Sequence, residues 1–67
     1  MWYFKKEKKD EFLKGRKILW ISYFTGLTQG YISRILNRKV GCSRVIAVCL
    51  GFIGGTDNYL YYFDKGE

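Results

Sequence analysis

The side chains best suited to molecular recognition in this chain lie in residues 28–37. Glutamine, serine, asparagine and arginine can all form hydrogen bonds with base edges in the major groove of DNA. If this stretch is an α-helix, at about 100° per residue, its polar and small positions share one arc. They are Gln29, Gly30, Ser33, Arg34 and Asn37. The pattern therefore predicts a helix face that could read a nucleic acid.

The opposite side of the same predicted helix is apolar and can be buried. An arc of about 140° holds Tyr31, Ile32, Ile35 and Leu36. Thr28 can begin the helix, because its hydroxyl can accept a hydrogen bond from a free backbone N–H of the first turn. An outer face that is only solvated would carry more Glu and Lys, so we favour recognition as its role.

Positive charge is concentrated in the middle of the chain, whose formal net charge is +6. Residues 12–56 contain no acidic residue, and their basic residues are Lys14, Arg16, Lys17, Arg34, Arg38, Lys39 and Arg44. A field of one sign attracts phosphate groups, as in nucleic-acid-binding proteins. The same charge also serves solubility, and by itself it does not distinguish DNA from RNA or from an acidic protein surface.

A chain of 67 residues can form one small domain, and we expect residues 1–67 to be a single one. Glycines recur at intervals of about ten residues, a length typical of short helices that end in a left-handed glycine. The expected fold class is all-α, with four or five helices. They cover residues 5–14, 17–25, 28–37 and 43–50, with a further helix over residues 56–63.

Two of these segments allow more than one interpretation. Residues 18–24 are apolar nearly all round, so propensity alone favours a buried strand, and only the segment that follows favours a helix. Residues 56–63 form an aromatic run that Thr56 could cap as a helix, and that could equally be an edge strand pairing with residues 2–4. We predict a helix in both places. Residues 43–50, begun by Ser43, are expected to form a buried helix.

Several positions share the spacing of a known motif, and they are Ser22, Gly26, Leu27, Thr28, Ile32 and Ile35. Their pattern resembles the helix-turn-helix of the Cro and lambda-repressor-like (XRE-type) DNA-binding proteins. Residues 31–37 are similar to the recognition helix of bacteriophage and mobile-element members. Gly26 would supply the positive φ of the turn, which a residue with a Cβ adopts only at a cost. The resemblance covers residues 15–52 and implies a lambda-repressor-like domain.

The resemblance implies a repressor-like transcriptional regulator that binds specific double-stranded DNA, with residues 28–37 as the recognition helix. The residues implied to lie nearest the bases are Thr28, Gln29, Gly30, Ser33 and Arg34. Those implied to contact the DNA backbone are Lys17, Tyr31, Asn37, Arg38, Lys39 and Arg44. A reader this small implies a homodimer on a palindrome, with an interface drawn from Phe52, Ile53, Tyr59, Tyr61, Tyr62 and Phe63. Alternatively, residues 2–4 cover these side chains inside one core.

A second class of function is compatible with the same fold, namely a protein-binding module such as a phage antirepressor or an inhibitor of a host nucleic-acid enzyme. The family usually has glutamine where Ile18 stands, and Gly30 has no side chain with which to read a base. Both departures favour a protein partner. An RNA-binding role has less support, because no exposed aromatic platform can be identified.

Other kinds of chemistry have little support. The chain has no histidine, and its carboxylates all lie before residue 12 or after residue 56, so no enzyme, cofactor or metal centre is expected. Cys42 and Cys49 would stand about 10 Å apart on one helix, too far for a disulfide, and are expected to be buried thiols. No apolar run approaches the roughly 20 residues of a membrane span, and no secretory signal is apparent. We expect a soluble cytoplasmic protein.

Overall fold

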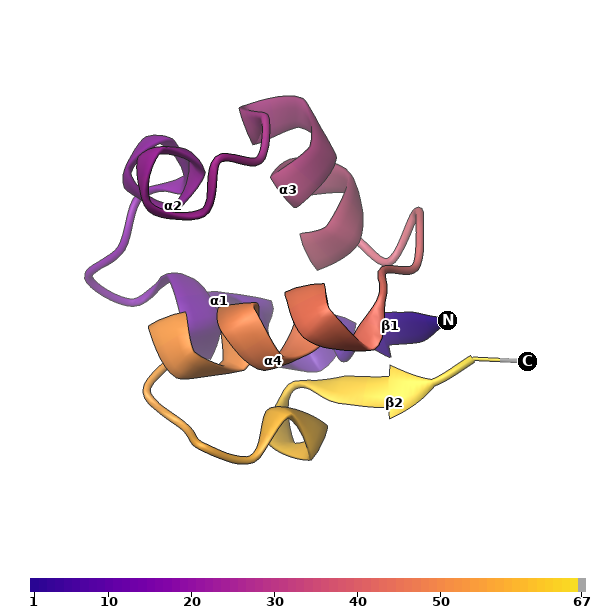
Figure 1. Ribbon diagram of the computed structural model, residues 1–67. Coiled ribbons are helices and arrows are strands. Elements are labelled where there is room, and N and C mark those ends of the chain that lie inside the picture. Colours follow the sequence, from indigo (N-terminus) through magenta and orange to yellow (C-terminus); the bar gives the residue numbers. More distant parts are fainter. Residues whose placement is uncertain (67) are drawn as a thin grey trace.

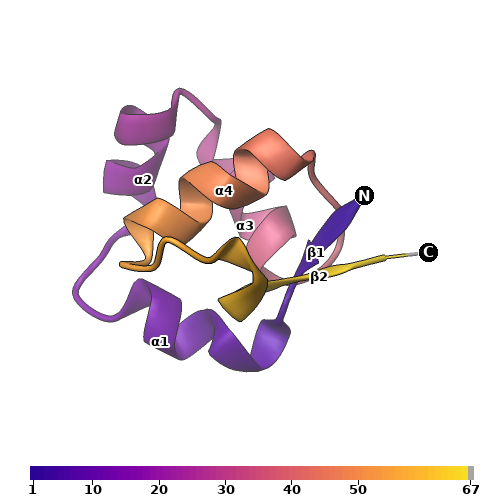
Figure 2. The same cartoon turned by 60° about the horizontal axis from the view of Figure 1, so that its bottom comes forward.

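The computed structural model describes residues 1–66, which form four α-helices, two short 3-10 helices and a two-stranded sheet. The elements in chain order are β1 (Trp2–Phe4), η1 (Lys6–Lys8), α1 (Lys9–Leu13), α2 (Ile18–Thr25), α3 (Gln29–Leu36), α4 (Arg44–Ile53), η2 (Tyr59–Tyr61) and β2 (Phe63–Lys65). Figure 1 shows α2 and α3 at the top of the molecule, with α4, α1 and the sheet below them. In Figure 2, α4 crosses the middle of the view between α2 and α1.

The two ends of the chain pair as an antiparallel sheet, so the fold is mostly helical but not all-α. The register places Phe4 of β1 opposite Phe63 of β2. The helix expected over residues 56–63 is wrong, because this segment contains η2 and the start of β2. On its other side, β1 exchanges two backbone hydrogen bonds of 2.8 Å between Trp2 and Cys42. Aromatic residues pack well on a pleated surface once a partner strand is present, and β1 supplies that partner.

An aromatic cluster joins the sheet to α1. Phe4 packs edge-on against Phe12 of α1 and against Phe63 of β2, with ring centroids 5.4 and 5.3 Å apart, and it stacks on Tyr62. Such aromatic pairs add to the gain from burying their surface. The same core includes side chains from α2, α3 and α4, which are Ile21, Ile32, Ile35, Leu36, Ala47, Leu50 and Ile53.

This core buries half of the side chains that the sequence suggested for a homodimer interface. Ile53, Tyr62 and Phe63 are buried in the same core as Phe4 of β1 and Phe12 of α1. Phe52 stays 67% exposed, and Val45, on the same face of α4, is 77% exposed. The expectation that residues 43–50 are buried all round is therefore wrong. In so small a domain, the core cannot surround a surface helix on every side.

Helix lengths differ from the expected ranges where tertiary contacts intervene. The first helix, expected over residues 5–14, is shorter, since η1 precedes α1 and α1 ends at Leu13. α4 continues past Gly51 to Ile53, and there the helix touches η2. A Cβ on Gly51 would lie 3.1 Å from the Cα of Tyr59, so any larger residue here would have to push the backbone of η2 outward by a few tenths of an ångström. Across residues 1–66, none of the helices has the length and apolar character needed to cross a membrane.

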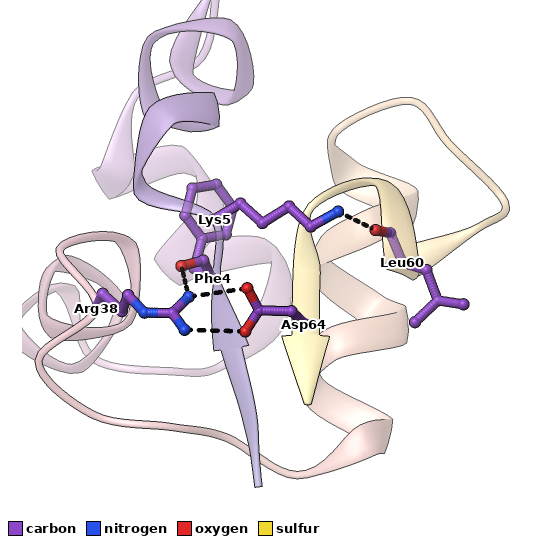
Figure 3. Close-up of polar contacts among 5 residues, drawn as sticks. All are labelled: Phe4, Lys5, Arg38, Leu60 and Asp64. Carbon is purple, nitrogen blue, oxygen red and sulfur yellow. Dashed lines mark hydrogen bonds and ion pairs between the residues drawn. The ribbon is translucent and has the colours of Figure 1, made fainter. Parts of the chain in front are cut away.

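Arg38 ties the end of α3 to the sheet (Figure 3). Its guanidinium donates hydrogen bonds of 3.2 and 3.0 Å to the two carboxylate oxygens of Asp64, and one of 3.0 Å to the backbone carbonyl of Phe4. The hydrogen bonds to Asp64 are the main reason why the pKa of Arg38 is raised. Nearby, Lys5 Nζ donates to the backbone carbonyl of Leu60 at 2.8 Å. Side chains far apart in the sequence thus join the sheet to its neighbours.

The backbone at Arg38 is left-handed, with φ at 58°, a conformation that favours glycine. Arg38→Gly and Arg38→Ala both remove the Asp64 pair, but only the glycine variant relieves the backbone. We therefore expect the glycine variant to melt about 3–5 °C above the alanine variant in thermal unfolding followed by circular dichroism. Asp64→Asn, which leaves the backbone unchanged, reports on the pair alone. Equal melting temperatures of the Arg38 variants would show that the backbone carries no strain here.

The two cysteines lie in different environments, and only Cys42 fits the expectation of a buried thiol. Cys42 is 1% exposed, and burial raises its pKa from 9.0 to about 11, whereas Cys49 is exposed. Below pH 9, iodoacetamide should alkylate Cys49 and spare Cys42, as mass spectrometry can check. As the pH rises from 9 to about 11, the unfolded chain ionises Cys42 before the folded chain does, so the free energy of unfolding falls. A Cys42→Ala variant should lack that part of the decline.

Candidate nucleic-acid interface

A tight turn sets α3 at an angle to α2. Gly26 follows α2 with φ at 78°, and its N–H donates to the carbonyl of Ser22 at 2.8 Å. The Ser22 hydroxyl donates to the carbonyl of Leu27, while the Leu27 N–H donates to the Thr25 hydroxyl at 3.2 Å. The expected positive φ at Gly26 is confirmed, and the residues of the turn satisfy one another's polar groups.

The first turn of α3 is capped, and its inner face is buried. The Thr28 hydroxyl accepts a hydrogen bond of 3.1 Å from the Tyr31 N–H, as the sequence predicts. Ile32, Ile35 and Leu36 are each 0% exposed, and Tyr31 is half-buried against the core. These anchors fix the rotation of α3 about its axis, so its opposite side must face outward.

That outer side carries the residues that the sequence placed nearest the bases. Thr28, Gln29, Gly30 and Arg34 are exposed, and Ser33 is half-buried. Figure 1 shows α3 at the top of the molecule beside α2, with its C-terminal end near β1. α3 and its turn thus bring these five residues together on one surface.

Gly30 lies next to the side chain of Arg34, which follows one turn later in α3. A Cβ on Gly30 would lie 3.5 Å from Arg34 Nη1, so the guanidinium lies back over the glycine. Long helical side chains lean toward the N-terminus of their helix in this way. A Cβ at position 30 would thus make an ordinary van der Waals contact with the guanidinium, which lies on the same surface of α3.

The cations implied to contact a nucleic-acid backbone divide into two groups. Lys17, Lys39 and Arg44 are exposed, at the start of α2, after α3 and at the start of α4. Within residues 1–66 the ion pairs are Lys8 with Glu11 and Arg38 with Asp64, so these three cations have no acidic partner there. They are free to meet phosphate.

Asn37 and Arg38, by contrast, have hydrogen-bond partners within the chain. The Asn37 side chain accepts a hydrogen bond of 2.8 Å from Lys9 Nζ and donates one of 2.9 Å to the Ser33 carbonyl, which closes the end of α3. Arg38 is held by Asp64 and by the backbone of Phe4. Their polar groups stabilise the fold, so a phosphate would compete with these intramolecular partners for either side chain.

Sequence reasoning missed the outer face of α2. Only Ile21 in this helix is fully buried, while Leu19, Trp20, Tyr23 and Phe24 are exposed. A helix that is apolar all round predicts full burial. A chain of this size has too little core to surround such a helix. The short length of the chain was therefore the signal in the sequence that could have predicted an exposed face of α2.

Within residues 1–66, no three cysteine or acidic side chains gather where they could hold a metal ion. No family model, curated protein or solved structure matches this chain. The function is therefore argued from the geometry and charge of its own surface.

Proposed function

We propose that the chain is a sequence-specific double-stranded DNA-binding transcriptional regulator of the repressor type, which reads DNA with α3. The observation that carries the proposal is the outer face of α3. Gln29 and Arg34 project from a capped helix that three fully buried side chains hold in place. The segment from residue 12 to residue 56, which contains α2, α3 and α4, has no acidic residue to repel phosphate.

The turn geometry supports the resemblance to Cro and lambda-repressor-like helix-turn-helix domains. In such domains the second helix of the pair enters the major groove with its N-terminal residues leading. Applied to this chain, Thr28, Gln29 and Ser33 would approach the bases first. Gln29 suits the N6 and N7 groups of adenine, and Arg34 suits the O6 and N7 acceptors of guanine.

Phosphate contacts would come from the free cations around α3. Lys17, Lys39 and Arg44 are the candidates, and the half-buried Tyr31 is a fourth. Each phosphate contact contributes about 0.9 to the slope of log K against log salt concentration. Binding should therefore weaken steeply with salt, while the base contacts set the sequence preference.

A mobility-shift assay with random duplex DNA at low salt tests the proposal first, and selection of bound duplexes from that pool then defines a site. With that site, Arg44→Ala should lower the salt slope by about 1. Lys65→Ala, which removes an exposed cation of β2, should leave the slope unchanged. Absence of any shift at micromolar protein would contradict DNA binding.

The second candidate is a protein-binding module on the same fold, such as an antirepressor or an inhibitor of a nucleic-acid enzyme. It is favoured by Ile18 at the start of α2, which offers no polar group to a phosphate, and by the apolar surface of α2. A missing mobility shift together with an intact fold would support this candidate.

The proposed regulator would bind a palindrome as a dimer. Phe52 of α4 and Tyr61 of η2 are the residues of the suggested interface that stay exposed. Sedimentation equilibrium with and without the selected duplex tests this arrangement. A single monomer on the selected site would contradict it.

A further inference from the structure

The outer face of α2 leaves four large apolar side chains uncovered. Tyr23 is 84% exposed, Phe24 70%, Leu19 52% and Trp20 49%. Small soluble domains rarely leave several large apolar side chains together at the surface, and such a group marks an interaction site.

This surface is hollowed at the start of α2. A groove of about 700 Å³ lies between the α1–α2 loop and the helix, and its apolar wall is formed by Leu19, Trp20 and Tyr23. Its rim carries three cations, Lys14, Arg16 and Lys17. Arg16 Nη1 donates to the backbone carbonyl of Phe12 at 3.0 Å, so this cation is held in position. The site therefore combines a concave apolar floor with a positive edge.

The rim is not neutralised by the part of the chain that the structure describes. No acidic side chain lines the groove, and both ion pairs of residues 1–66 lie elsewhere, at Lys8 and at Arg38. An occupant with negative charge beside an apolar anchor would satisfy both parts of the groove.

We propose that this groove binds an acidic segment of a partner protein, which inserts an aliphatic or aromatic side chain between Leu19, Trp20 and Tyr23. Carboxylates flanking that anchor would then lie beside Lys14, Arg16 and Lys17. The anchor supplies buried apolar area, and the carboxylates supply orientation and a faster encounter. The inference goes beyond DNA recognition and does not depend on it.

Two other occupants fit the groove less well. In a symmetric pair of copies, the same cations of both chains would be brought together without an acid between them. A single-stranded nucleic acid would stack its bases on open aromatic faces. Trp20 and Phe24 instead stack on each other, with ring centroids 5.2 Å apart and planes 14° from parallel.

Selection from a random peptide library tests the proposal with a probe of unbiased sequence. The library is selected in parallel on the parent protein and on Tyr23→Ala, a change of an exposed side chain that leaves the core intact. We expect the parent alone to enrich peptides that combine Asp or Glu with an apolar residue. The best peptide is then synthesised and titrated in a Trp2→Phe background, where Trp20 is the only tryptophan and reports occupancy by its fluorescence.

In that titration, Tyr23→Ala should weaken peptide binding by about tenfold or more. Lys14→Glu should also weaken peptide binding, by a factor that grows as the salt concentration is lowered. Phe52→Ala, which removes another exposed ring, from α4, and Arg34→Ala should leave peptide affinity unchanged. If only Arg34→Ala weakened peptide binding, the peptide would bind at the proposed DNA face and not in the groove, and the proposal would be wrong.

Four other results would overturn the proposal. They are equal enrichment on the parent and on Tyr23→Ala, enriched peptides without acidic residues, saturable binding of oligo-dT at Trp20 without peptide binding, and self-association that Tyr23→Ala abolishes. The third would assign the groove to single-stranded nucleic acid, and the fourth would assign it to a second copy.

Discussion

Arg34→Ala is expected to weaken binding to the selected duplex by about tenfold to a hundredfold. Arg34 is exposed on the outer face of α3, and no acid of residues 1–66 pairs with it. Its guanidinium lies over Gly30 on this face, and the proposed contact is a bidentate one with guanine. Truncation removes that contact and leaves the acceptors of the base without a partner in the interface. Quantitative mobility shifts at a fixed salt concentration measure the effect.

The control for this prediction is the affinity of the same variant for random duplex DNA. Arg34→Ala should bind random duplex nearly as well as the parent does, apart from the loss of one positive charge, because phosphate contacts carry no sequence information. Lys65→Ala should change neither affinity. Binding of the Arg34→Ala variant to the selected site within about twofold of the parent would remove Arg34 from the interface.

Phe4→Ala should destabilise the fold by about 3–5 kcal/mol. Phe4 is 0% exposed and contacts Phe12, Tyr62 and Phe63, so its ring joins both strands to α1. Natural domains are stable by only about 5–15 kcal/mol, and one this small lies near the lower end of that range. We therefore expect the variant to be largely unfolded at 37 °C, as measured by far-ultraviolet circular dichroism and urea titration.

A matched substitution on the surface separates burial from residue type. Phe24→Ala removes the same ring from a position that is 70% exposed, and it should change the free energy of unfolding by less than about 1 kcal/mol. If both variants lost similar stability, or if Phe4→Ala stayed folded with the same urea midpoint, the aromatic cluster would not be the centre of the core.

The elements around the candidate interface are predictable because their signals are local. Gly26 ends α2, and Thr28 and Ser43 cap the helices that follow them, through hydrogen bonds that span three or four residues. The spacing of Ile32 and Ile35 predicts which side of α3 is buried, since helical periodicity operates within two turns. The exposed position of Arg34 follows from the same periodicity.

Two of the proposed interface residues have partners far along the chain. The resemblance implies that Asn37 and Arg38 contact the DNA backbone, and the structure also gives both intramolecular partners, Lys9 and Asp64. Nothing near position 38 in the sequence indicates that a carboxylate of the last strand comes within 3.0 Å. The left-handed backbone at Arg38 is likewise held by the surrounding structure.

By itself, the sequence of this protein determined the helices from residue 18 to residue 50, the turn between the first two of them and the outward face of α3. Only the tertiary structure decided that the chain ends pair as a sheet, that Asp64 holds Arg38 and that α2 exposes its aromatic side. The physical reason is the separation in sequence between the residues that interact. Capping and helical periodicity involve neighbours within a few residues, whereas strand pairing and burial depend on how all the elements share one small core.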